Sequence, residues 1–284
     1  MFNPLQNQLI EELITLALHE DIGDGDHTTL ACIPTGVVQR AMLLVKEAGI
    51  LSGVEIARRV LFRVDPMIIM DQLLQEGEVI SSGNIAFYLE GSPRSILTAE
   101  RLVLNIMQRM SGIATYTRKL VNSVSDTGVT VIDTRKTGPG MRVLEKLAVK
   151  TGGGGNHRMG LYDVIMIKDN HIDYAGGIPQ AIKSVHKYLQ ENDLDLKIEI
   201  EARTLEDVRL IMRTGGINRV MLDNFTPELI IEALPLISPE YETEASGGIK
   251  ESNLRAFAET GVQFISIGAL THHVKSLDLS LKAC

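Results

Sequence analysis

The sequence predicts an α/β protein in which the C-terminal part forms a parallel sheet, closed or nearly closed into a barrel. Its 284 residues fit a barrel-sized domain together with a smaller one. Apolar residues make up 44% and charged residues 23% of the chain, which is typical of globular proteins. From about residue 129 onward, short apolar runs alternate with helical stretches, and this alternation indicates right-handed βαβ units.

The N-terminal part lacks this regular alternation, and its short apolar runs indicate a mixed arrangement of strands and helices. Apolar residues recur at helical spacing after Pro4, which opens the first predicted helix. The expected elements are a helix over 4–20, a strand over 41–46, a helix over 54–62, strands within 78–90 with a turn at Gly83, and a helix over 98–124 with a break at Ser111-Gly112.

Six later apolar runs are expected to form the parallel sheet, with helices in the segments between them. Six βαβ units are enough for a closed or nearly closed barrel. The expected strands are 129–133, 164–168, 198–201, 220–223, 242–246 and 264–268, and the expected helices are 178–189, 205–213, 228–234 and 251–259.

Polar residues or glycines stand at the end of each expected strand. In parallel barrels the active site lies at the C-terminal ends of the strands. One polar residue at such an end is commonly a helix cap, but six consecutive cases containing Arg, Lys, Glu and Asp indicate a functional mouth. The series comprises Asp133-Thr134-Arg135-Lys136, Lys168-Asp169-Asn170-His171, Glu199 with Glu201, Asp223-Asn224, Ser246-Gly247-Gly248 and Gly268.

Positive charge is concentrated in one part of this acidic chain. Residues 133–171 contain seven Lys or Arg and four Asp or Glu, whereas the whole chain has a net charge of −8. A basic pocket in an acidic protein suits small, multiply anionic substrates. Arg142, Lys146 and Lys150 recur at helical spacing and are expected on a solvated helix face.

Two glycine-rich segments are candidates for phosphate contacts. Residues 151–158 precede a strand and lack the Walker lysine, so we interpret them as a flexible turn that brings His157 and Arg158 to the mouth. Ser246-Gly247-Gly248 is the better candidate, because it follows a strand and is expected to open a helix. Gly268, after the last strand, could complete this phosphate site.

Glu201 and Asp223 end successive expected strands. Two carboxylates opposite several cations could hold Mg²⁺, bind ribose hydroxyls, or act as acid and base. A salt bridge to Lys168 or Lys136 is the structural alternative, and the two interpretations are compatible.

Several protein classes are disfavoured by composition. The two cysteines, Cys32 and Cys284, are far apart, which suits a reducing compartment, and a cytoplasmic location is expected. No run of 18 apolar residues predicts a membrane span, and the N-terminus does not resemble a signal peptide. An acidic chain with 4% aromatic residues is a poor candidate for nucleic-acid binding.

Nine ordered motifs in the sequence resemble the quinolinate phosphoribosyltransferase family. The one departure is Gly138, where the family more often has a larger residue. The motifs are Thr98-Ala99-Glu100-Arg101 with Leu104-Asn105, Ser111-Gly112-Ile113-Ala114-Thr115, Asp133-Thr134-Arg135-Lys136-Thr137 with Pro139-Gly140, Asn156-His157-Arg158, Ile167-Lys168-Asp169-Asn170-His171, Glu199-Ile200-Glu201, Leu222-Asp223-Asn224, Ser246-Gly247-Gly248-Ile249, and Gly268-Ala269-Leu270-Thr271-His272.

The resemblance implies an N-terminal α/β sandwich domain over 1–112 and an incomplete, seven-stranded α/β barrel over 113–284, whose last segment could pack back on the first domain. It implies transfer of phosphoribosyl from phosphoribosyl pyrophosphate (PRPP) to quinolinate with decarboxylation. The implied products are nicotinate mononucleotide, pyrophosphate and CO₂. The resemblance also implies that Mg²⁺ accompanies PRPP and that the reaction belongs to NAD biosynthesis. A homo-oligomer, dimer or hexamer, is implied, in which the N-terminal region of one subunit covers the mouth of its partner.

The resemblance also implies roles for individual residues. Lys136, Lys168, Glu201 and Asp223 would be catalytic, with Glu201 and Asp223 also holding Mg²⁺, directly or indirectly, and the ribose hydroxyls. Thr134 would contact substrate, and Lys136 would meet the pyrophosphate. Quinolinate would bind Arg135, Arg158, Lys168, His157 and the partner's Arg101, and the 5′-phosphate would bind Ser246, Gly247, Gly248 and Gly268.

Two alternatives remain open on the sequence. A related phosphoribosyltransferase could act on a monocarboxylate such as nicotinate, which needs fewer cations at the mouth. A non-catalytic protein could instead bind an anionic nucleotide, and loss of a strand-end carboxylate would favour that class. Both Glu201 and Asp223 are present.

Overall fold

The computed structural model describes residues 2–284, which form two compact units. The first unit contains the residues up to Arg118 together with Thr137–Gly153 and Leu270–Cys284. The second contains Lys119–Lys136 and Gly154–Ala269. Within residues 2–284, no helix combines the length and apolar character that a bilayer crossing requires.

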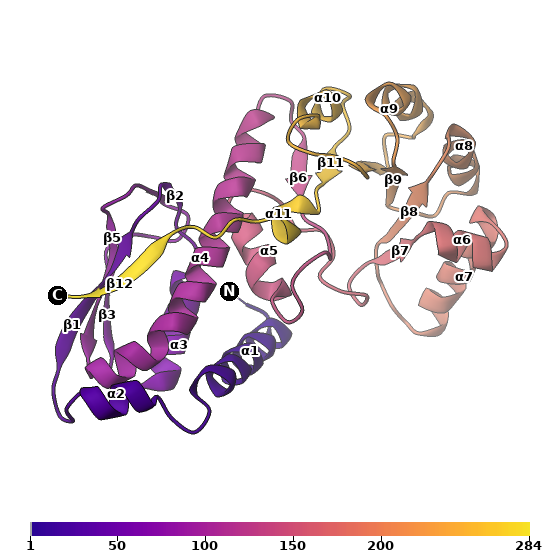
Figure 1. Ribbon diagram of the computed structural model, residues 1–284. Helices are drawn as coiled ribbons and strands as arrows, with labels where there is room; N and C mark the ends of the chain where they lie inside the picture. Colours follow the sequence, from indigo (N-terminus) through magenta and orange to yellow (C-terminus); the bar gives the residue numbers. More distant parts are fainter. Residues whose placement is uncertain (1) are drawn as a thin grey trace. The chain divides into compact units, whose positions relative to one another are not determined.

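The first unit contains a four-stranded antiparallel sheet in the order β12-β1-β5-β3. The C-terminal strand β12 pairs with β1, so segments from the N-terminal and C-terminal parts of the sequence share one sheet (Figure 1). The elements are α1 (Pro4–Ile22), α2 (His27–Cys32), β1 (Gln39–Val45), β2 (Gly49–Ile50), α3 (Val54–Val64), β3 (Ile69–Gln72), β4 (Val79–Ile80), β5 (Ile85–Gly91), α5 (Arg142–Thr151), β12 (Leu279–Ala283), and most of α4 (Pro93–Ser123).

The core of this unit is apolar. Leu43 and Val45 of β1 and Phe87 and Leu89 of β5 are buried, as the alternation of side chains along a strand requires. The first helix begins where the sequence predicts. Asn3 caps it, because its Oδ1 accepts the backbone N–H of Gln6 at 2.8 Å.

The predicted break at Ser111-Gly112 is wrong, because α4 runs without interruption from Pro93 to Ser123. Both residues serve tertiary packing instead. The Ser111 hydroxyl accepts the backbone N–H of Ser52 at 3.0 Å and donates to the carbonyl of Ser52 at 3.2 Å. Gly112 has no Cβ, and the Lys275 carbonyl oxygen occupies the space that a Cβ would need.

The second unit contains a six-stranded parallel sheet in the order β6-β11-β10-β9-β8-β7, flanked by helices (Figure 1). The sheet is not closed, and outside its named strands Gly155 forms a parallel bridge with Ile132 of β6. All six predicted strands are confirmed within two residues. The elements are β6 (Thr130–Ile132), β7 (Ile165–Ile167), α6 (Asp169–Ala175), α7 (Ile178–Glu191), β8 (Ile198–Ala202), α8 (Leu205–Thr214), β9 (Arg219–Asp223), α9 (Pro227–Ala233), the 3₁₀ helix η1 (Leu234–Leu236), β10 (Glu242–Ser246), α10 (Leu254–Ala258) and β11 (Phe264–Ser266); α11 (Ala269–His272) follows.

The predicted solvated face of α5 is wrong for Lys146. Lys146 is 1% exposed and Arg142 is half-buried, whereas Lys150 is exposed. Residues four apart in a helix are rotated by about 40° from one another, so these three span about 80° of the helix surface. Tertiary packing covers the part of that surface at Lys146 and leaves Lys150 exposed. The neighbouring Glu145 is fully buried and forms an ion pair with Arg109 at 2.6 Å, so this part of α5 carries buried charge.

Candidate active site

A cavity in the second unit has a volume of about 560 Å³, within the range of small-molecule sites. Residues at and just after the ends of the parallel strands line it, as expected for a barrel mouth. Eleven residues predicted for the site are brought together there: Thr134, Arg135, Lys136, His157, Arg158, Lys168, Glu201, Asp223, Ser246, Gly247 and Gly248.

Two predicted residues are not among those lining this cavity in the described chain. Arg101 is an exposed residue of α4 and belongs to the first unit. Gly268 follows β11, but Ser266 of that strand contributes to the lining instead. Met166 and Met221 also line the cavity and were not predicted from the sequence. Asn224 lines it as well; the sequence placed it in the strand-end series with Asp223 but gave it no role of its own.

The cavity holds four cationic side chains and two carboxylates. Burial lowers the pKa of Arg158, and the nearby positive charge of Arg135 lowers it further. The Nε atom of Arg135 is buried and has no hydrogen-bond partner among residues 2–284. Two close guanidinium groups and an unused N–H donor indicate a part of the cavity in which positive charge exceeds negative charge until an anion binds.

Lys168 and Glu201 form the ion pair that the sequence offered as an alternative. Lys168 Nζ lies 2.6 Å from Glu201 Oε1, and the backbone N–H of Asp169 donates to Glu201 Oε2 at 3.2 Å. Burial, followed by the negative charge of Glu201, raises the pKa of Asp223. The ion pair and a role in the cavity coexist, because all three charged side chains also line it.

A buried aspartate positions the segment that carries His157. Asp133 Oδ1 accepts the backbone N–H of His157 at 2.9 Å, and its Oδ2 accepts the side-chain amide of Asn156 at 2.5 Å. Asp133 is fully buried, directly after β6. The glycine-rich turn is thus anchored at its end, where Gly155 bridges to β6, and this anchor directs His157 and Arg158 to the cavity.

The loop after β10 differs in one respect from the prediction. Ser246-Gly247-Gly248 lines the cavity, but no helix opens there, because α10 begins only at Leu254 and has five residues. Gly247 and Gly248 have φ angles of 93° and 66°, which favour glycine. A phosphate at this loop would therefore meet backbone N–H groups of a turn and not the end of a helix.

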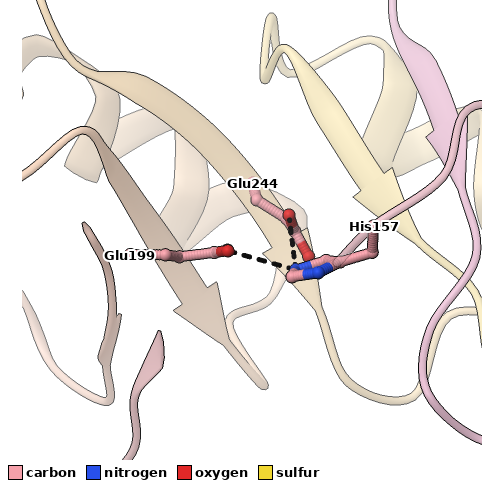
Figure 2. Close-up of side chains that lie close together, drawn as sticks. All are labelled: His157, Glu199 and Glu244. Atoms are coloured by element: carbon pink, nitrogen blue, oxygen red, sulfur yellow. Dashed lines mark ion pairs between the residues drawn. The ribbon is translucent and has the colours of Figure 1, made fainter. Parts of the chain in front are cut away.

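Beneath the cavity, His157 reaches between two buried glutamates, Glu199 of β8 and Glu244 of β10 (Figure 2). His157 Nε2 lies 3.1 Å from Glu199 Oε2 and 3.5 Å from Glu244 Oε2. His157 Nδ1 accepts the backbone N–H of Arg158 at 2.6 Å. Because Nδ1 accepts, Nε2 carries the proton of the neutral ring and points it at the carboxylates.

The two glutamates resist ionisation. Burial is the main cause, and it raises the pKa of Glu199 and of Glu244 to about 7. Opposing this, Arg219 lies close and its Nη1 donates to Glu244 Oε2 at 2.9 Å. The three side chains of Figure 2 could in principle hold a metal ion. Because Arg219 already compensates their charge, a buried ion-paired cluster accounts for them.

Comparisons with known proteins give consistent results. The families described as the N-terminal and C-terminal domains of quinolinate phosphoribosyl transferase match residues 26–111 and 113–282. A decarboxylating quinolinate phosphoribosyltransferase, 1b of Nicotiana tabacum, is 43% identical over 96% of this chain and 82% of its own. The probable carboxylating nicotinate-nucleotide pyrophosphorylase of Bacillus subtilis is 40% identical over 96% and 92% of the two chains. The crystal structure of NadC from Streptococcus pyogenes has a TM-score of 0.92 at 35% identity, covering 100% and 99% of the two chains.

Proposed function

The chain belongs to the quinolinate phosphoribosyltransferase family, and on that basis we propose that it transfers phosphoribosyl from PRPP to quinolinate. The reaction releases pyrophosphate and CO₂ and gives nicotinate mononucleotide for NAD biosynthesis. The mouth of the parallel sheet is the site of this reaction, because it gathers eleven of the residues that the family resemblance implies.

One observation carries the assignment most directly. The positive charges of Arg135 and Arg158 lie close enough for Arg135 to lower the pKa of Arg158, and the buried Nε of Arg135 has no hydrogen-bond partner among residues 2–284. Quinolinate supplies two adjacent carboxylates, and a guanidinium binds a carboxylate through two parallel hydrogen bonds. Arg135, Arg158 and Lys168 bind quinolinate in this assignment. His157 has both ring nitrogens engaged by the protein, so it borders the substrate and does not pair with its charge.

The phosphoribosyl group occupies the rest of the cavity. Its 5′-phosphate accepts hydrogen bonds from the loop at Ser246, Gly247 and Gly248, and Lys136 meets the pyrophosphate. Thr134 contacts substrate beside Lys136. Glu201 and Asp223 accept hydrogen bonds from the ribose hydroxyls, and Gly268 remains an outlying candidate for the phosphate.

The chemistry requires positioning and charge more than a nucleophile. The bond between the anomeric carbon and pyrophosphate breaks, and the positive charge that develops is stabilised by Glu201 and Asp223. The pyridine nitrogen forms the new bond to that carbon and becomes positively charged. The adjacent carboxylate then departs as CO₂ and leaves the electron pair of the broken bond on the ring carbon, where the neighbouring positive nitrogen stabilises it. A proton binds to this pair and so replaces the carboxylate on the ring.

Mg²⁺ is proposed as the ion that accompanies PRPP. It prefers oxygen ligands and commonly uses one or two carboxylates together with substrate phosphates. Asp223 fits this role, because Asn224 donates to one of its oxygens, Oδ2, and a cation would offset the negative charge of Glu201 that, after burial, raises the pKa of Asp223. Glu201, with both oxygens engaged, fits an indirect role. The ion would neutralise charge on the leaving pyrophosphate.

A homo-oligomer with shared sites is proposed for the quaternary structure, either a dimer or a hexamer. Arg101 is exposed on α4, which suits a residue that contacts the substrate of a partner subunit. The exposed, unpaired thiols of Cys32 and Cys284 favour a reducing location such as the cytoplasm.

The proposed function is tested by incubating the protein with PRPP, quinolinate and Mg²⁺ and measuring CO₂ and nicotinate mononucleotide. Both products are expected in equal amounts, and Lys168→Ala should form neither at a comparable rate. Lys187→Ala, an exposed position on α7, is the matched control and should behave as wild type. Absence of both products from the wild-type protein would contradict the assignment.

A further inference from the structure

Asn224 has an unusual backbone conformation directly at the end of β9. Among residues 2–284, only Asn224 and Asp193 combine a side chain with a positive φ angle, 58° and 51° respectively. Asp193 is exposed, next to the end of α7. Asn224 lines the cavity, where a left-handed residue that is not glycine persists only if surrounding contacts hold it.

Two hydrogen bonds provide such contacts. The backbone N–H of Asn224 donates to the carbonyl of Ser246 at 2.8 Å, which joins the end of β9 to the end of β10. The side-chain Nδ2 of Asn224 donates to Asp223 Oδ2 at 2.8 Å. One residue therefore contacts both the carboxylate assigned to ribose and the loop assigned to phosphate.

Gly247 completes the arrangement from the opposite side. A Cβ on Gly247 would overlap Asn224 Oδ1 and would lie 2.9 Å from the backbone nitrogen of Asn224. Gly247 also has a φ angle of 93°. The loop can lie directly against Asn224 only because residue 247 has no side chain.

We propose that Asn224 is a positioning residue that fixes Asp223 relative to the Ser246–Gly248 loop and thereby fits the cavity to ribose 5-phosphate. This inference rests on the proposed function. The hydroxyls and the 5′-phosphate of a ribose are held at a limited separation, so the two protein groups that bind them must keep a matching separation. With Oδ2 held by Asn224, Asp223 presents its other oxygen to the ligand.

The test compares Asn224→Asp, Asn224→Gly and Gly247→Ala with wild type. Aspartate tolerates the left-handed conformation but faces Asp223 with like charge, and glycine keeps the conformation but removes the amide. We expect the KM for PRPP to rise by about tenfold or more in each variant, since a hydrogen bond to a charged group is lost or displaced. The KM for quinolinate should change by less than about twofold.

Asp193→Gly is the control for backbone conformation, because it changes the other left-handed residue, which does not line the cavity. It should leave both KM values unchanged. Circular dichroism and the melting temperature establish that each variant is folded. The rise in melting temperature caused by PRPP alone gives a readout independent of turnover, and it should be smaller in the three variants than in wild type.

The outcomes separate the two ideas. If the wild type neither turns over quinolinate nor is stabilised by PRPP, the proposed function fails, and this inference fails with it. If the wild type is active but the variants keep its KM for PRPP and its PRPP-induced shift, the inference alone is overturned. Equal increases in both KM values would also overturn it, because they would show a general structural role.

Discussion

Glu199, Glu201 and Glu244 are buried in the parallel sheet of the second unit about as completely as Leu43, Phe87 and Leu89 are in the antiparallel sheet of the first. The difference between the two sheets therefore lies in the chemistry of the buried groups and not in their exposure. Buried carboxylates weaken a fold unless cations and hydrogen bonds compensate them, whereas buried apolar side chains stabilise it. The antiparallel sheet thus serves stability, and the parallel sheet accepts a cost. Of its three buried glutamates, Glu201 lines the proposed substrate cavity, whereas Glu199 and Glu244 are compensated by His157 and Arg219.

The largest effect on stability should come from the apolar sheet. Phe87 is fully buried, so Phe87→Ala should lower the free energy of unfolding by about 3–5 kcal/mol. The kcat and KM of the molecules that remain folded should stay near wild type. Thermal unfolding measures stability, and steady-state kinetics below the transition measure kcat and KM. A changed KM at an unchanged melting temperature would contradict the assignment of stability to the antiparallel sheet and of activity to the parallel sheet.

The largest effect on activity should come from the charged mouth. Arg135→Ala and Lys168→Ala should each lower kcat/KM on the order of 10²–10³-fold, because each removes a charged donor from the reacting groups. Melting temperatures should fall little, since these residues line a cavity and do not fill a core. Near-normal turnover of either variant at saturating substrate would show that its assigned role is wrong, and Lys187→Ala again provides the surface control.

Arg101 is the proposed exception, because we propose that it contacts the substrate of a partner subunit although it lies in the first unit. Arg101→Ala and Lys168→Ala should each be nearly inactive. In a dimer with free subunit exchange, about half of the molecules become hybrids with one intact site, so a mixture should regain roughly a quarter of wild-type activity. Subunit exchange without recovered activity would place Arg101 in its own subunit's site or outside any site.

The smallest effect concerns the pH dependence of stability. Burial raises the pKa of Glu244 from 4.5 to about 7, so between these values the folded state binds more protons than the unfolded state. The contribution of Glu244 to the free energy of unfolding should therefore be greatest below about pH 4.5. It should decline as the pH rises through 7. The decline is at most about 1.4 kcal/mol per pH unit for each proton released.

Glu244→Gln should make that decline shallower without abolishing it, because Glu199 is raised to a similar pKa. Denaturant unfolding at intervals from pH 5 to pH 8 provides the measurement. Glu259→Gln, an exposed residue paired with Arg255, is the matched control and should leave the slope as in wild type. Stability that rises over this interval in wild type would contradict the direction of the shift.

The same comparison explains which parts of the structure the sequence predicts. Most of the six parallel strands were predictable because they are short apolar runs that end in polar residues. The exception is β10, in which Ala245 is the one apolar residue among five. Most of the mouth was predictable because the ends of parallel strands meet on one edge of a sheet. Even the paired glutamates of β8 carried a signal, since Glu199 and Glu201 interrupt an otherwise apolar strand.

The wrong predictions concern residues whose environment is created by distant parts of the chain. Ser111 and Gly112 are typical of a helix break in local sequence, but they are explained by tertiary contacts. Ser111 hydrogen-bonds to Ser52, and Gly112 leaves space for the carbonyl of Lys275. Lys146 looks solvated until tertiary packing buries it. Helical spacing describes only the residue's own element, so neither contact was accessible from local pattern.

The most direct test of the charged mouth is the ratio of kcat/KM for quinolinate and for nicotinate, measured with PRPP and Mg²⁺. Quinolinate should be used and nicotinate should be rejected on the order of 10⁴-fold, because the missing carboxylate leaves the guanidinium groups of Arg135 and Arg158 without a partner. Comparable values for the two acids would show that the second carboxylate has no role. They would contradict the claim that the cations of the parallel sheet exist to bind it.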